Sequence, residues 1–196
     1  MSPDLINQLL WPFKQLPTQY LVIDTETTGL FDAEGAPALV SLGLVLMRQG
    51  DVQDSKEFLI RPHRQITTEA SGINGISQEQ AMGHPTFKEQ WALIHSWIEG
   101  QLVVMHNAFF DWSLITDHIQ RYDVGIPKVA GVFCSQRAAQ PWAQSVGIAC
   151  SERGPSLDAL TKHLRIKSLR QANNNYHGAL IDAQQTANVV RHLQAL

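Results

Sequence analysis

The sequence predicts an α/β fold, a five-stranded mixed sheet with helices on both faces. Two observations lead to this fold class. Three strand-like apolar segments follow one another between residues 20 and 60, which predicts an antiparallel meander. Two later strand-like segments are each followed by a helical pattern, which predicts two parallel strands. The chain shows no repeat of solenoid length and no low-complexity tract, which excludes a repeat architecture.

The meander occupies the first third of the chain. Its segments are YLVID at 20–24, ALVSLGLVLM at 38–47 and VQDSKEFLI at 52–60. The turn Arg48-Gln49-Gly50-Asp51 separates the second segment from the third. The stretch from Ile66 to Pro85 follows, and the sequence predicts it only as a long polar connection.

The remaining elements alternate between helix and strand. Phe87 to Glu99 is expected to be helical, and the buried strand QLVVMH at 101–106 leads into a helix from Asn107 to about Arg121. We then expect, in order, a fifth strand near Lys128 to Cys134, a helix near Ser135 to Gln144, a helix from Ser156 to about Leu164, a loop through Asn173-Asn174-Asn175, and a last helix ending near Leu193.

With 196 residues and 44% apolar content, the chain is long enough for one substantial core but short for two domains. We assign residues 20–196 to one domain and residues 1–19 to an N-terminal helical extension. In the extension, Ser2-Pro3-Asp4 resembles a helix cap, and apolar residues have helical spacing until Pro12 ends the pattern. We expect this short helix to dock on the chain's own core rather than on a partner.

Composition limits the partners and the location. Fifteen basic and eighteen acidic residues give a formal charge of −3, so any nucleic-acid contact must be local rather than a general coating of DNA. The N-terminus lacks a basic leader and no apolar run approaches about 18 residues, so neither a secretory signal nor a membrane span is predicted. Cys134 and Cys150 form no C-x-x-C pattern, which disfavours a thiolate zinc site and fits a reducing cytoplasm.

The first candidate functional motif is Asp24-Thr25-Glu26-Thr27-Thr28-Gly29, at the end of the first strand. Residues two apart in a strand project to the same side, so Asp24 and Glu26 can present two carboxylates together. Carboxylate oxygens are the ligands that Mg²⁺ prefers. Acids at strand ends also serve as turn or cap residues, and this motif alone does not decide between the two roles.

The second motif, His106-Asn107-Ala108-Phe109-Phe110-Asp111, lies where the fourth strand passes into a helix. Asn107 is the expected N-cap, and Asp111 falls in the first turns. An acid at this place also stabilises the helix dipole by roughly 0.3–1 kcal/mol, so a purely structural role stays open.

The third motif is His177-Gly178-Ala179-Leu180-Ile181-Asp182. On one continuous helix, residues five apart point about 140° away from each other. We therefore expect His177 on the loop before the helix and Asp182 within the helix, with Gly178 permitting the bend. Open α/β sheets place ligands at the ends of their central strands, which is where the three motifs are expected to meet.

In this order, the three motifs resemble the exonuclease motifs of the DEDD superfamily of 3′–5′ exonucleases, in its His-bearing DEDDh subgroup. Ile73-Asn74-Gly75-Ile76 and Ser156-Leu157-Asp158-Ala159-Leu160 are similar to further landmarks of that family, and the likeness runs from about Tyr20 to Leu193. The branch that it resembles most includes the proofreading (epsilon) subunit of bacterial DNA polymerase III and stand-alone relatives. The resemblance implies an RNase H-like fold in an exonuclease domain that removes nucleoside 5′-monophosphates from the 3′ end of single-stranded DNA.

The resemblance also implies a site for two divalent cations, Mg²⁺ or Mn²⁺. Asp24 would bridge both ions, and Glu26, Asp111 and Asp182 would complete their shells. His177 would take the proton from the attacking water, since an imidazole titrates near neutral pH. Candidate substrate contacts are Thr27, Leu30, Asn107, Phe110 and Arg170.

Some of these contacts have structural alternatives. Leu30 resembles an apolar wedge between terminal bases, or it fills the core beneath the meander. Phe109 and Phe110 are able to stack on bases, but beside a buried strand we expect at least one of them to pack in the core. A basic cluster before the third motif either holds backbone phosphates or forms a solvated helix face; it comprises Lys162, Arg165, Lys167 and Arg170.

The chain departs from the family pattern at a few positions. Asn74 stands where relatives commonly carry His, and Cys134-Ser135 replaces a common Asp-Thr. Oligoribonucleases tend to carry Met at the position of Thr27, which favours DNA over RNA, with an RNA-trimming exoribonuclease as the alternative. An inactive nuclease fold kept as a binding module is disfavoured because all four acids and the histidine are present. The sequence ends directly after its last expected helix, which favours independent action over permanent membership of the polymerase, and no protein partner is identified.

Overall fold

The structure, a computed structural model, describes residues 12–33, 35–170 and 176–196. Its centre is a five-stranded sheet with the strand order β3-β2-β1-β4-β5. The meander strands β1, β2 and β3 pair antiparallel, and β4 and β5 join them in parallel, so the predicted mixed sheet is confirmed. The strands are β1 Gln19–Thr27, β2 Leu39–Arg48, β3 Asp51–Leu59, β4 Leu102–Met105 and β5 Gly131–Cys134.

The helices follow the predicted order after the meander. They are α4 Phe87–Ile98, α5 Ala108–Arg121, α6 Ser135–Ser145, α7 Leu157–His163 and α8 Ala179–Gln194. Among the described residues, none of the helices is both long and apolar enough to span a membrane. The helix expected between Ser2 and Leu10 and the loop through Asn173-Asn174-Asn175 lie outside the described residues.

Several short elements were not predicted. The connection from Ile66 to Pro85 contains two helices, α2 Thr68–Asn74 and α3 Gln78–Met82. Each is too short to produce a helical period, and each depends on a cap: Thr67 accepts a hydrogen bond from the Ala70 amide, and Ser77 forms a capping box with Gln80. The other additions are the 3-10 helix η1 Pro12–Gln15 and a small hairpin of β6 Cys150–Ser151 and β7 Gly154–Pro155.

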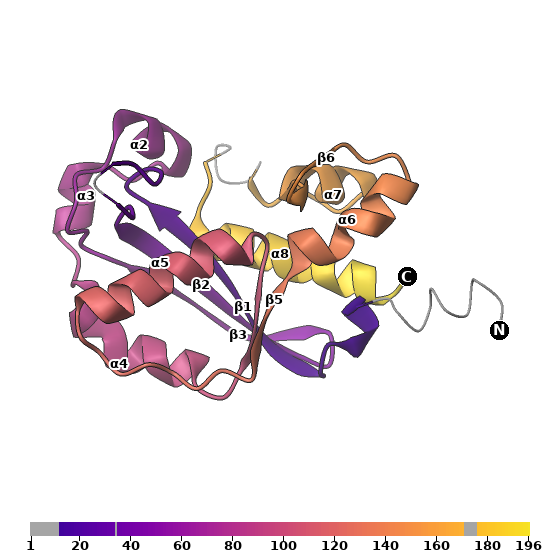
Figure 1. Ribbon diagram of the computed structural model, residues 1–196, viewed down its shortest axis with the longest axis horizontal. Helices are drawn as coiled ribbons and strands as arrows, with labels where there is room; N and C mark the ends of the chain where they lie inside the picture. Colours follow the sequence, from indigo (N-terminus) through magenta and orange to yellow (C-terminus); the bar gives the residue numbers. More distant parts are fainter. Residues whose placement is uncertain (1–11, 34, 171–175) are drawn as a thin grey trace.

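Two layers of helices cover the sheet (Figure 1). One core cluster joins α4 and α5 to one face, and a second joins α6, α7 and α8 to the other. Leu21 and Ile23 of β1 belong to the first cluster, while Tyr20 and Val22 belong to the second. Strand β1 is therefore buried on both faces, which explains its continuous apolar run. The same alternation, continued toward Thr27, directs Asp24 and Glu26 to the face of α8 and Thr25 to the face of α5.

A glycine allows α8 to begin directly against the sheet. Gly43 of β2 pairs with Asp24 of β1, and a Cβ atom at Gly43 would lie 2.2 Å from the backbone carbonyl atoms of Ala179 and 2.3 Å from the Leu180 nitrogen. Those neighbours are backbone atoms, so no side-chain rotation can relieve the contact. The close approach places the first turns of α8, including Asp182, beside the end of β1.

We expect Gly43→Ala to destabilise the protein and to displace the start of α8. The added methyl group must push two backbone segments apart, which should lower the free energy of unfolding by roughly 1–3 kcal/mol. Thermal and urea denaturation measure this loss.

Gly72→Ala is the matched control. Gly72 is exposed within α2, and a Cβ there would have no atom within 4 Å, so the substitution should leave stability unchanged or raise it slightly. Equal stability of the Gly43→Ala variant and the parent would contradict the close packing of α8.

Candidate active site

The three sequence motifs meet in one cleft of about 330 Å³, where the ends of β1 and β4 face the first turns of α5 and α8. The cleft brings together all five residues predicted to be catalytic. It is lined by Asp24, Thr25, Glu26, His106, Asn107, Phe110, Asp111, Gln136, Ser156, Leu157, Asp158, Arg170, His177 and Asp182.

Each carboxylate reaches the cleft from a defined element. Asp24 and Glu26 project together from β1, Asp111 lies in the first turn of α5, and Asp182 lies in the first turn of α8. The hydroxyl of Thr25 donates a 2.6 Å hydrogen bond to Asp111, which ties β1 to α5. Thr25 was not among the predicted site residues, although its alternation with Asp24 and Glu26 points it toward the α5 face.

Burial and mutual repulsion make the acids reluctant to ionise. Burial raises the pKa of Asp24 well above its usual range, and the nearby carboxylates of Asp111, Asp182 and Glu26 raise it further. The pKa of Glu26 is raised to about 8, first by burial and then by Asp182, and burial raises the pKa of Asp111 to about 7. A cation that binds in this cluster would therefore stabilise the ionised form of the carboxylates.

Arg170 supplies a positive charge inside this cluster. Its Nε and one Nη donate to the two oxygens of Asp182 at 2.7 and 2.6 Å, and its other Nη donates to Asp158 at 2.8 Å. The sequence made Arg170 a candidate substrate contact, in a basic cluster that either holds phosphates or forms a solvated helix face. In the structure, Arg170 instead pairs with two acids of the cleft, while Lys162, Arg165 and Lys167 are exposed.

His177 lies on the loop just before α8, as expected, and its side chain is 40% exposed. Its Nδ1 is 3.5 Å from Asp182, and ligand atoms of Glu26, His177 and Asp182 all lie within 4.8 Å of one another. Burial, and then the charge of Arg170, lower the pKa of His177 below its usual value, although Asp182 opposes the shift. The imidazole is therefore neutral at neutral pH and able to accept a proton.

The unpredicted helix α2 supports the loop that carries His177. The backbone amide of His177 donates to the Ile73 carbonyl at 2.9 Å, and the Tyr176 ring lies against Gly75, where a Cβ would come within 3.0 Å of the ring. Asn74, which departs from the family pattern, is buried and its side-chain amide donates to the Thr27 carbonyl at 3.3 Å. These contacts join the end of β1 to the catalytic loop.

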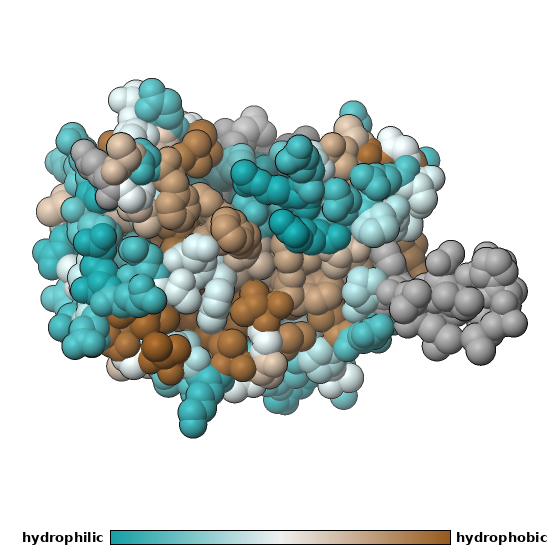
Figure 2. Space-filling model, viewed as in Figure 1, coloured by the Kyte–Doolittle hydropathy of each residue, from teal (hydrophilic) through white to brown (hydrophobic). Residues whose placement is uncertain are grey.

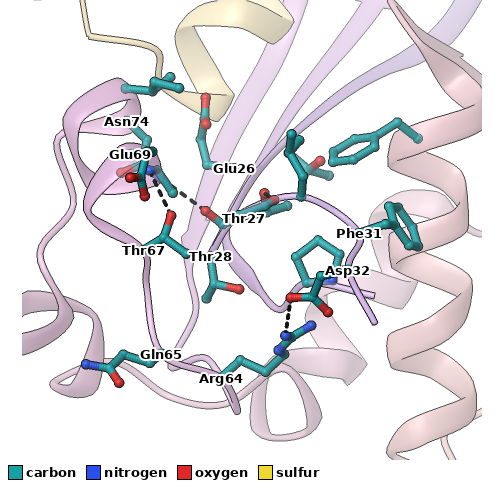
Figure 3. A pocket seen from close by; sticks show the side chains of 17 residues that line it. Glu26, Thr27, Thr28, Phe31, Asp32, Arg64, Gln65, Thr67, Glu69 and Asn74 are labelled. Atoms are coloured by element: carbon teal, nitrogen blue, oxygen red, sulfur yellow. Dashed lines mark hydrogen bonds and ion pairs between the residues drawn. The ribbon is translucent and has the colours of Figure 1, made fainter. Parts of the chain in front are cut away.

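A larger hollow of about 520 Å³ adjoins the cleft and contains three predicted substrate contacts (Figure 3). Thr27 lines it, but its hydroxyl already donates to the Gly29 carbonyl at 2.7 Å. Leu30 is 77% exposed, so the alternative that it fills the core is wrong. Phe110 packs against the main core, as expected for at least one of the two adjacent phenylalanines. Across the hollow, Arg64 pairs with Asp32 at 2.7 Å.

Two polar residues of the second motif, Asn107 and His106, also line the cleft. Asn107 is the N-cap residue of α5, as predicted, but its side chain makes no capping hydrogen bond and lines the cleft. His106 is buried between Ser135 and the Pro155 carbonyl, each 3.1 Å away. Burial lowers the pKa of His106 to about 4, so it stays neutral and joins β4 to α6 and β7.

A five-stranded mixed sheet that gathers four carboxylates and a histidine at its strand ends defines a nuclease with an RNase H-like fold. The chain belongs to the exonuclease family: the family described as Exonuclease (RNase_T) matches residues 21–190. DNA polymerase III subunit epsilon of Escherichia coli K12 is 30% identical over 177 residues, which cover 88% of this chain and 70% of that protein.

Other similar proteins differ in their length. DNA polymerase III PolC-type of Thermotoga petrophila is 30% identical over 173 residues, 87% of this chain, but the chain spans only 11% of that protein. Among solved structures, the nuclease domain of 3′hExo, a DEDDh family member bound to rAMP, has a TM-score of 0.71 at 17% identity, covering 91% of this chain and 92% of that chain. Exonuclease X in complex with 5′ overhanging duplex DNA has a TM-score of 0.64 at 23% identity, covering 90% and 91%. These two structures show the shared fold.

The raised pKa values predict how stability depends on pH. Glu26 and Asp111 bind protons more tightly in the folded chain, so their contribution to stability is complete below about pH 4 and is lost as the pH rises through 7 and 8. In a chelator, Tm should fall between pH 7 and pH 8.5, above the range in which the buried His106 binds a proton on unfolding, and Mg²⁺ or Mn²⁺ should restore it at the high end. Calorimetry of the parent and of Glu26→Gln, which should show a shallower fall, measures this. A Tm that stays constant or rises over this pH range would contradict the raised pKa values of Glu26 and Asp111.

Arg170→Gln should destabilise the metal-free protein. The substitution leaves Asp182 without its paired cation, which should cost roughly 1–3 kcal/mol, and it should enlarge the rise in Tm produced by Mg²⁺. Arg61→Gln is the control, because its 3.5 Å pair with Glu89 lies at the surface. Equal shifts in the two variants would mean that Arg170 does not balance the acidic cluster.

Proposed function

We propose that the chain is a metal-dependent 3′–5′ exonuclease that removes nucleoside 5′-monophosphates from single-stranded DNA. The observation that carries this proposal is the convergence of Asp24, Glu26, Asp111 and Asp182 in one cleft, with His177 beside them. Family membership supports the class of reaction. The strand polarity, the sugar and the strand state rest on the motif resemblance and are subjects of the experiment below.

The donor set fits two divalent cations. Four carboxylates offer the hard oxygen ligands that Mg²⁺ and Mn²⁺ prefer, and two such ions match their four negative charges. When bound, the ions stabilise the charge that develops on the phosphoryl oxygens. Asp24 and Glu26 would hold them from β1, and Asp111 and Asp182 from the two helices. Arg170 would have to give up its contacts with Asp182 at least in part.

The chain's own groups then account for the hydrolysis. The neutral imidazole of His177 takes a proton from the attacking water, and the water oxygen forms a bond to phosphorus. The bond between phosphorus and the 3′ oxygen of the preceding nucleotide breaks, and that oxygen takes up a proton from solvent water. The products are a nucleoside 5′-monophosphate and a strand shortened by one nucleotide with a free 3′ hydroxyl.

The 520 Å³ hollow is the place for the terminal nucleoside. It opens from the end of β1 and has mostly apolar walls, which suit a base, with Leu30 exposed at its edge. RNA trimming is the second candidate, because the 3′hExo nuclease domain with the same fold is described as bound to rAMP. A binding module without activity is the third, and the presence of all five predicted catalytic residues opposes it.

Two further parts of the sequence interpretation stay predictions. They are the division into an extension of residues 1–19 and a domain of residues 20–196, and the cytoplasmic location. One contact bears on the proposed boundary between residues 19 and 20. Phe13 of η1 is fully buried and packs edge-on against Phe133 of β5, with ring centroids 5.3 Å apart.

Matched 3′-labelled and 5′-labelled strands of DNA and RNA, incubated with Mg²⁺, Mn²⁺ or chelator and separated on gels, test the proposal. We expect release of labelled mononucleotide from 3′-labelled DNA at once, a ladder from 5′-labelled DNA, and no reaction in chelator. Mononucleotide released first from the 5′ end would overturn the polarity, and faster cleavage of RNA would favour the second candidate.

Variants of the cleft test the roles of the residues in the same assay. Asp24→Asn should abolish hydrolysis, and His177→Ala should lower it by roughly 10²–10⁴-fold. Asp24→Asn removes a charge from a repelling cluster, so it should fold as well as the parent. His163→Ala, at an exposed position of α7, is the control. Full activity of Asp24→Asn would remove the central ligand from the scheme.

A further inference from the structure

A second hollow of about 280 Å³ lies beside the carboxylate cleft, and Phe31 and Phe110 separate it from the 520 Å³ hollow that we assign to the terminal nucleoside. We call this second hollow the upstream hollow. It shares Asn107, Phe110 and Gln136 with the cleft, so the two spaces are continuous. Its lining comprises Phe31, Asn107, Phe109, Phe110, Cys134, Gln136, Arg137 and Arg153.

Exposed aromatic rings form one wall of the upstream hollow. Phe109, in the first turn of α5, is 80% exposed, and Phe31 is 51% exposed. Phe31 packs edge-on against Phe110 with ring centroids 5.7 Å apart, and Phe110 is anchored on the main core. Two phenyl faces are therefore offered to solvent at the mouth of the cleft without packing in the core, which is the arrangement that marks a binding surface.

Two arginines, Arg137 and Arg153, also line the upstream hollow. Among the described residues, Arg137 and Arg153 have no acidic group within ion-pair distance. The other two arginines near the catalytic spaces are paired, Arg64 with Asp32 and Arg170 with Asp158 and Asp182. Hydrophilic side chains gather between α5 and α6 in the space-filling view (Figure 2).

The second of these arginines is held by a fixed hairpin. Arg153 lies in the turn between β6 and β7, and Gly154 approaches α6 so closely that a Cβ there would lie 2.4 Å from the Gln136 carbonyl oxygen. Gln140 donates to the Glu152 carbonyl at 3.3 Å, and Gln136 donates to the Pro155 carbonyl at 3.2 Å. A further hollow of about 430 Å³, which also contains the acidic Glu152, continues the path past Arg153.

We propose that the upstream hollow binds the unpaired nucleotides that precede the terminal one, with Arg137 and Arg153 on backbone phosphates and Phe31 and Phe109 on bases. The inference rests on the proposed function. A single strand alternates phosphates with free base faces, and this hollow combines cations with aromatic rings in the same way. In a duplex each base already stacks on its neighbours, so its face is not available to a protein ring. The exposed rings of Phe31 and Phe109 therefore favour an unpaired strand.

Charge explains why such a hollow is needed. The cleft is acidic and Arg170 is held by two carboxylates, so neither attracts a phosphate chain from solution. Arg137 and Arg153 line the adjoining hollow and have no acidic partner in the described part of the chain, so they are able to do so. A protein with a net charge of −3 thus gains a local attraction where the strand must enter.

The test compares substrates with and without upstream nucleotides. The double variant Arg137→Gln/Arg153→Gln is assayed with the p-nitrophenyl ester of thymidine 5′-monophosphate, which has no upstream nucleotides, and with a 12-nucleotide thymidine strand. We expect KM for the strand to rise roughly tenfold, and its salt slope to fall by about 1.4, or 0.7 for each lost phosphate contact. KM and kcat for the ester should not change.

Phe109→Ala tests the aromatic wall separately. Phe109 is exposed, so the variant should keep the Tm of the parent, while KM for the 12-nucleotide strand should rise roughly 5- to 100-fold. Lys88→Gln/Lys128→Gln is the control for the arginine pair, because it removes the same charge from exposed positions that line neither the cleft nor the two hollows beside it. It should leave the strand kinetics unchanged.

Several results would overturn the inference. These are an unchanged KM for the strand in the arginine variant, an equal rise for the ester and the strand, or an equal loss in the lysine control. A parent that hydrolyses neither substrate would contradict the proposed function instead. The upstream hollow is then tested by fluorescence anisotropy of the labelled 12-nucleotide strand in chelator, where the arginine variant should bind at least tenfold more weakly.

Discussion

Four carboxylates held in one buried cleft are the constraint on which the rest of the structure depends. Burial and repulsion raise the pKa of Asp24, Glu26 and Asp111, so the arrangement is costly unless positive charge enters it. Arg170 provides part of that charge through Asp182. The hydrogen bond from Thr25 to Asp111 and the close approach of α8 at Gly43 hold the acids together against this repulsion.

The pleat of β1 explains how one strand serves two helical layers. Successive residues project to opposite faces, so the carboxylates of Asp24 and Glu26 face α8 while the hydroxyl of Thr25 reaches Asp111 of α5. The acids thus enter the cleft from both sides of the sheet. Gly43 completes this arrangement by letting α8 begin against β2, directly opposite Asp24.

The sheet and the four acids were predictable because each produces a recognisable pattern in the sequence. Apolar runs identify the strands, and the three motifs identify the carboxylates and His177. The remaining features depend on contacts between distant residues. Helices α2 and α3 are too short to show a period. Asn107 is the predicted N-cap of α5, but the sequence does not show that its side chain makes no capping hydrogen bond. The pairing of Arg170 with Asp158 and Asp182 likewise depends on the fold.

Pairing, rather than the number of cations, determines which parts of the surface attract a phosphate chain. The sequence suggested the cluster that ends at Arg170, since it counts charges along the chain. In the fold, Arg170 and Arg64 pair with acids, whereas Arg137 and Arg153 have no acidic partner among the described residues. Because these two lie on α6 and on the hairpin packed against it, they place positive charge on one side of the cleft, in the same hollow as exposed phenyl rings. A strand that approaches from this side meets attraction before it meets the carboxylates.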